Sequence, residues 1–63
     1  MPNAHFPIPE DPRIADWVAG LDDELRELFE ERAAIREYEG GLTRIDAERE
    51  AKADVLRWQF LHR

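Results

Sequence analysis

A very short connection between two helical segments constrains this chain more than any other feature. Gly40-Gly41-Leu42-Thr43 ends one helix and begins the next within four residues. Gly40 can adopt the left-handed conformation that closes a helix C-terminus without a Cβ clash. Thr43 is a favourable N-cap, and Asp46 three residues later resembles the acid of a capping box. Because so short a connection folds its flanking helices back on each other, the sequence predicts a helical hairpin.

The spacing of apolar residues on either side of the connection predicts three helices, over about residues 11–19, 22–39 and 43–61. Asp11-Pro12 supplies an N-cap and a first helical residue with a suitable fixed φ. The predicted fold class is therefore all-α, with two long antiparallel helices preceded by a short one.

The first ten residues predict an extended, Pro-rich arm. Pro2, Pro7 and Pro9 lack backbone N–H donors and favour extended geometry in the residues before them. Phe6 and Ile8 alternate with these prolines, so a docked arm and a frayed terminus both remain open. We expect residues 1–10 to form the arm and residues 11–63 a single small domain.

Length and composition narrow the functional classes. At 63 residues and without cysteine, the chain has one small core and neither disulfides nor thiolate metal sites. A net charge of −6 disfavours nucleic acid and anionic membranes as partners. There is no run of about 20 apolar residues and no secretory signal pattern. We expect a cytoplasmic protein that does not bind membranes.

The third predicted helix has two apolar sides. One side carries Leu42, Ile45, Ala53, Leu56 and Phe60, and the nearly opposite side carries Ala47, Ala51, Val55, Trp58 and Leu61. One antiparallel neighbour covers only one side. We expect the side from Ala47 to Leu61 to form a face for a partner protein or a second copy. The alternative is that Trp58 and Leu61 complete an internal core with Trp17.

Catalytic, cofactor-binding and metal-binding residues are not expected. His5 and His62 lie at opposite ends of the chain, without the paired spacing of a zinc site. The glutamates lack the Glu-x-x-His pairs of a di-metal bundle. The glycine pair follows no strand and precedes no lysine, so it is not a phosphate loop. These patterns favour a protein that is not an enzyme.

Two charged surfaces suggest alternatives. An acidic face contains Glu27, Glu30, Glu31 and Glu37. It is either solvated or presented to the basic cleft of a nucleic-acid-binding protein, as in an inhibitor or decoy.

The cations Arg49, Lys52 and Arg57 lie near Trp58, as in single-strand binding sites. Acids at helical spacing offer them a local use instead, in the pairs Arg44–Glu48, Glu48–Lys52, Asp46–Arg49 and Asp54–Arg57. Nucleic-acid binding is therefore the less favoured interpretation.

One segment resembles known sequences. Glu31-Arg32-Ala33-Ala34-Ile35, followed by Tyr38-Glu39-Gly40-Gly41-Leu42-Thr43-Arg44 and Ala47-Glu48, is similar to a stretch in short proteins of bacterial and phage mobile elements. The resemblance covers about residues 30–50 and implies a mobile-element origin and a helical hairpin, but no activity. The sequence as a whole favours a small interaction module that self-associates, most simply as a homodimer.

Overall fold

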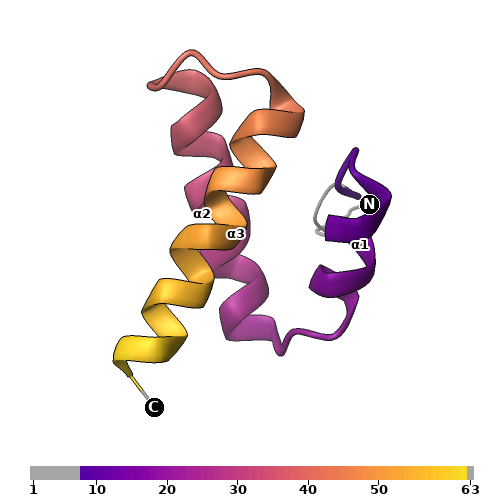
Figure 1. Cartoon of the computed structure of the whole chain (residues 1–63), viewed down its shortest axis with the longest axis vertical. Helices are drawn as coiled ribbons and strands as arrows, with labels where there is room; N and C mark the ends of the chain where they lie inside the picture. The colour runs from indigo at the N-terminus through magenta and orange to yellow at the C-terminus, as the bar shows by residue number, and fades with distance from the viewer. Residues whose placement is uncertain (1–7, 63) are drawn as a thin grey trace, which may run out of the picture.

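A computed structural model describes residues 8–62, which form three helices and no strand. Helix α1 spans Pro12–Ala19, α2 spans Asp23–Tyr38 and α3 spans Arg44–Leu61. Helices α2 and α3 pack side by side, joined by the loop at the top of Figure 1, and α1 lies beside them. The all-helical prediction and the hairpin are confirmed. Most of the predicted Pro-rich arm, residues 1–7, lies outside the described residues.

Each helix begins behind an oxygen-bearing side chain that accepts a hydrogen bond from the first turn. The N-caps are Asp11 for α1, Asp22 for α2 and Thr43 for α3. Thr43 Oγ1 accepts from the backbone N–H of Asp46 at 3.2 Å, as the capping pattern predicts. None of these three helices is both long enough and apolar enough to cross a bilayer.

The two glycines between α2 and α3 have different roles. The left-handed residue is Gly41, with φ of 71°, so its expected position at Gly40 was wrong. At Gly40 the constraint is space, because a Cβ there would lie 2.6 Å from the carbonyl oxygen of Arg36. The connection therefore needs one glycine for a close approach and the next for its backbone conformation.

The core lies where α1 covers one face of the hairpin. Its buried apolar members are Ile14, Val18, Phe29, Ala33, Ala51 and Val55. The rings of Trp17 and Phe29 pack edge to face, with centroids 5.8 Å apart. The Lys52 ammonium lies over the Trp17 ring, 5.3 Å from its centre. The opposite face of the hairpin is left without a helix.

Candidate protein interface

The predicted partner face on α3 was wrong at Ala47, Ala51 and Val55. All three have no solvent exposure, and Ala51 and Val55 belong to the core. Small side chains at a helix seam allow close approach, and they complement the large ring of Phe29 in the same core. The small-residue side of α3 therefore faces inward, and the side with bulkier residues faces out.

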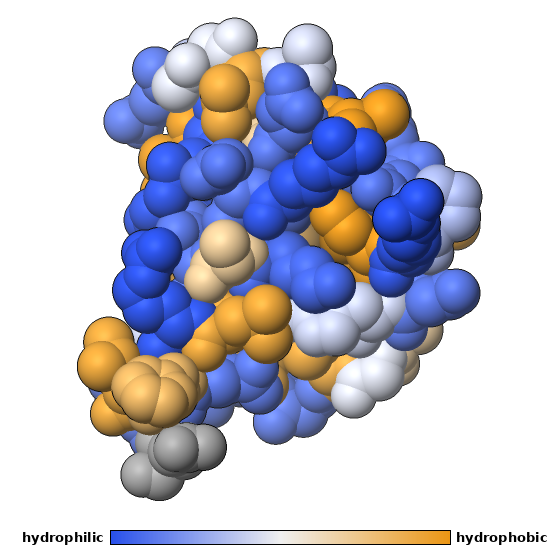
Figure 2. Space-filling model, in the orientation of Figure 1, coloured by the Kyte–Doolittle hydropathy of each residue, from blue (hydrophilic) through white to orange (hydrophobic). Residues whose placement is uncertain are grey.

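The exposed apolar side chains concentrate at the C-terminal end of α3. Leu56, Trp58, Phe60 and Leu61 are 39–68% exposed, and we call them the α3 tip. Figure 2 shows apolar side chains gathered at this end, at the lower left of the view. Trp58 and Leu61 come from the predicted partner face, whereas Leu56 and Phe60 come from the side that was expected to be covered. The last two turns are thus apolar around most of their circumference.

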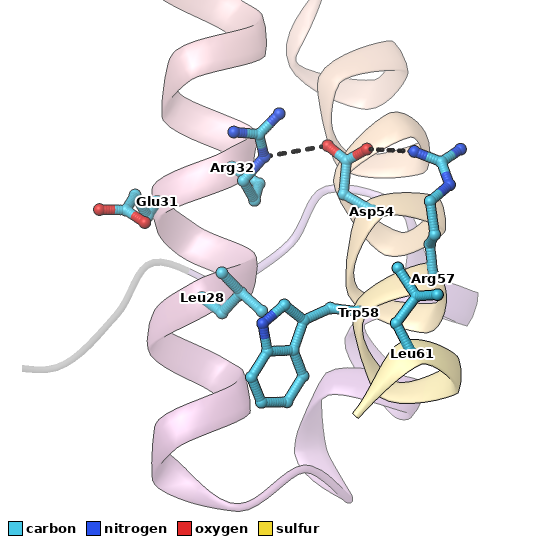
Figure 3. Close-up of a pocket in the computed structure, with 7 residues that line it drawn as sticks. All are labelled: Leu28, Glu31, Arg32, Asp54, Arg57, Trp58 and Leu61. Atoms are coloured by element: carbon cyan, nitrogen blue, oxygen red, sulfur yellow. Dashed lines mark hydrogen bonds and ion pairs between the residues drawn. The ribbon is translucent and has the colours of Figure 1, made fainter. Parts of the chain in front are cut away.

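A groove runs between α2 and α3 beside the α3 tip, on the hairpin face that α1 does not cover. Its volume is about 350 Å³, and Leu28 and Trp58 lie between the two helices in Figure 3. An adjoining hollow of about 330 Å³ shares Leu28, Glu31 and Trp58 with it. The Trp58 indole stacks on the His62 ring at a centroid distance of 4.3 Å, which supports it from the solvent side.

One carboxylate organises the cations along the groove. Asp54 accepts hydrogen bonds from Arg32 at 3.1 Å and from Arg36 at 2.9 Å, and Arg57 approaches to 3.7 Å. Burial raises the pKa of Asp54, but the hydrogen bonds and charges of Arg36 and Arg32 outweigh this effect and hold the pKa below its ordinary value. Three guanidinium groups around one carboxylate leave positive charge beside the groove of an acidic protein.

The predicted acidic face divides into two groups. Glu27 and Glu31 are exposed, as expected for a solvated face. Glu30 and Glu37 instead pair with Arg44 at 3.2 and 3.3 Å, so their assignment to that face was wrong. Positions 30 and 37 are seven residues apart and share a stripe that faces α3.

Helical spacing predicts the pair of Glu48 with Arg44, but no pattern in the sequence predicts the contacts of Glu48 with the residues before α1. The Glu48 side chain has no exposure, and it accepts hydrogen bonds from the backbone N–H groups of Glu10 and Asp11 and from Arg44 Nε. Burial lowers the pKa of Arg44, but the hydrogen bonds that Arg44 donates to Glu48 and Glu30 raise it by more. The network ties the start of α1 to α3, and it leaves Oε2 of Glu30 buried without a partner among residues 8–62.

Within residues 8–62, no group of three or more histidine or acidic side chains has the arrangement to hold a metal ion. In comparisons with known proteins, no family model, no curated protein and no solved structure matches this chain.

Proposed function

We propose that the chain is a non-enzymatic protein-interaction module that self-associates as a homodimer through the α3 tip and the adjoining groove. The observation that carries the proposal is the α3 tip itself: four large apolar side chains on two helical turns, each at least 39% exposed. Scattered apolar residues are ordinary on a surface, but four on two helical turns, two of which line a groove, are typical of an interface.

The size of the molecule also supports association. A standard interface buries about 800 Å² per partner, and the total accessible surface here is 4528 Å². A core in a chain of this length supplies only about 3–5 kcal/mol of stability. Covering one large apolar side chain contributes about 1.5–3 kcal/mol. Burial of the α3 tip in a dimer would therefore add a term comparable to the stability of the monomer.

Replacing Leu61 with Glu tests the proposal. Leu61 is 68% exposed and ends α3, so the change places a charge in the interface at little cost to the monomer. Sedimentation equilibrium should show a wild-type dimer and a Leu61→Glu variant that associates at least tenfold more weakly, about 1.4 kcal/mol.

Tyr38→Glu is the matched control. Tyr38 is 82% exposed and ends α2, so this variant adds the same charge at the same kind of helix end, away from the groove. It should dimerise like wild type. A wild-type chain that remains monomeric at millimolar concentration contradicts the proposal.

A second candidate is the acidic inhibitor of a nucleic-acid-binding protein. It is favoured by the exposed row Glu24, Glu27 and Glu31, none of which forms an ion pair within residues 8–62. Such a protein should displace labelled DNA from a DNA-binding protein with a basic cleft. Changing the three residues to Gln should abolish the displacement, and displacement that survives the change removes this candidate.

Origin and location remain proposals from the sequence. A mobile-element origin follows from the resemblance of residues 30–50, and a cytoplasmic location fits a chain without cysteine. Both are compatible with either candidate function.

A further inference from the structure

The groove is bordered by opposite charges. On α2, the acidic margin consists of Glu24, Glu27 and Glu31, which line the hollows with Leu28 and Trp58. On α3, Arg57 forms the basic margin. Figure 3 shows Glu31 and Arg57 at the two outer sides of the site, with Leu28 and Trp58 between them. Across this face the order is therefore acidic, apolar, basic.

Both margins have charge available for a partner. Arg57 is 69% exposed, and its contact to Asp54 is 3.7 Å, whereas Arg32 and Arg36 hold the same carboxylate at 3.1 and 2.9 Å. The acidic margin is exposed and has no ion pair within the described residues. A partner of complementary charge can engage both margins without breaking the internal network.

This order of charges is complementary to itself under a two-fold rotation. In a two-fold dimer every contact occurs twice. If one residue of the first copy contacts a different residue of the second copy, the same two residues also meet with the copies exchanged. An axis through the apolar centre places the acidic margin of each copy on Arg57 of the other. Building on the homodimer proposed above, we propose that a second copy docks on this groove in that arrangement, with Trp58 and Leu61 meeting across the axis.

The charges at the margins favour this arrangement over its alternatives. Two copies of net charge −6 repel each other at long range. An arrangement that places the two acidic margins against each other adds local repulsion. The proposed arrangement instead places the acidic margin of each copy beside Arg57 of the other. Opposite charges at the margins therefore select one relative orientation of the two copies.

Two charge-reversed variants test this orientation. In a dimer of R57E, the new carboxylate of each copy would face the acidic margin of the other copy. In a dimer of E31R, the new guanidinium of each copy would face Arg57 of the other copy. Each variant should associate about tenfold more weakly than its control, because two ion pairs per dimer become repulsive. The controls are R13E and E39R, which make the same charge changes at exposed positions outside the groove.

Mixing the two variants provides the decisive measurement. In a mixed dimer of one R57E copy and one E31R copy, position 31 of each copy again faces an opposite charge at position 57 of the other. The mixture should therefore regain wild-type association by sedimentation equilibrium, although each variant alone is weak. If the wild type dimerises and both variants dimerise like their controls, the orientation is wrong and the homodimer stands. If the wild type does not dimerise at all, the proposed function itself is overturned.

Discussion

Asp54 is the residue at which the two long helices are most directly connected by charge. It lies on α3 and accepts hydrogen bonds from Arg32 and Arg36 of α2. Its contact with Arg57 is one of the local pairs that helical spacing predicts, as are those of Arg44 with Glu48 and of Asp46 with Arg49. The contacts across the helices could not be predicted, because they depend on which side of α3 faces α2.

The lowered pKa of Asp54 predicts a loss of stability in acid. The unfolded carboxyl titrates near pH 3.9, above its value in the folded chain. As the pH falls, the unfolded state binds the proton first, so protonation favours unfolding. The stabilisation is complete above about pH 4 and disappears as the pH falls through the lower folded value.

Urea unfolding of wild type and Asp54→Asn between pH 7 and pH 2 measures this effect. The Asn side chain does not titrate, so the variant should be less stable at pH 7 and should lose less stability below pH 4. Parallel curves for the two proteins would show that Asp54 does not contribute to the acid sensitivity.

Helix α1 is held to the hairpin by its core residues and by hydrogen bonds from the two residues just before it to Glu48. Glu10 N–H lies 2.9 Å from Oε2 of Glu48, and Asp11 N–H lies 3.2 Å from Oε1. The expected pair of Glu48 with Lys52 is absent from the described contacts, because Glu48 faces α1 and Lys52 lies over Trp17. The N–H groups at a helix start have no partner within the helix, and Glu48 supplies an acceptor for that of Asp11, the N-cap.

Removal of the Glu48 carboxylate should therefore undock α1. Glu48→Ala leaves the partly buried guanidinium of Arg44 with one fewer partner and takes the acceptor from two backbone N–H groups, a loss of about 3–5 kcal/mol. Because the whole chain has stability of about that size, the variant should be largely unfolded by circular dichroism. Glu48→Gln keeps an acceptor and should lose less.

Glu50→Ala is the control for this experiment. Glu50 is exposed and lies 3.8 Å from Arg36, so its removal should cost less than about 1 kcal/mol. All variants are compared at one protein concentration, because dimerisation contributes to stability. Equal stability of Glu48→Ala and Glu50→Ala would contradict the proposed role of Glu48.

For the molecule as a whole, local signals predicted the helices and the hairpin but not which side of α3 faces inward. The N-caps at Asp11 and Thr43 and the glycine connection act over a few residues, so the sequence shows them directly. The inward side of α3 depends on fit against Phe29 and on Glu48, and neither is visible in periodicity. The candidate site was predicted in part for this reason: Trp58 and Leu61 are exposed, whereas Ala47, Ala51 and Val55 are core.

The hydrogen bonds between Glu48 and the residues before α1 have a consequence for the order in which we expect the chain to fold. Glu10 and Glu48 are 38 residues apart, whereas the hairpin closes through a short loop. Contacts that close short loops form sooner than those that close long ones. We therefore expect the hairpin of α2 and α3 to close before α1 docks against Glu48.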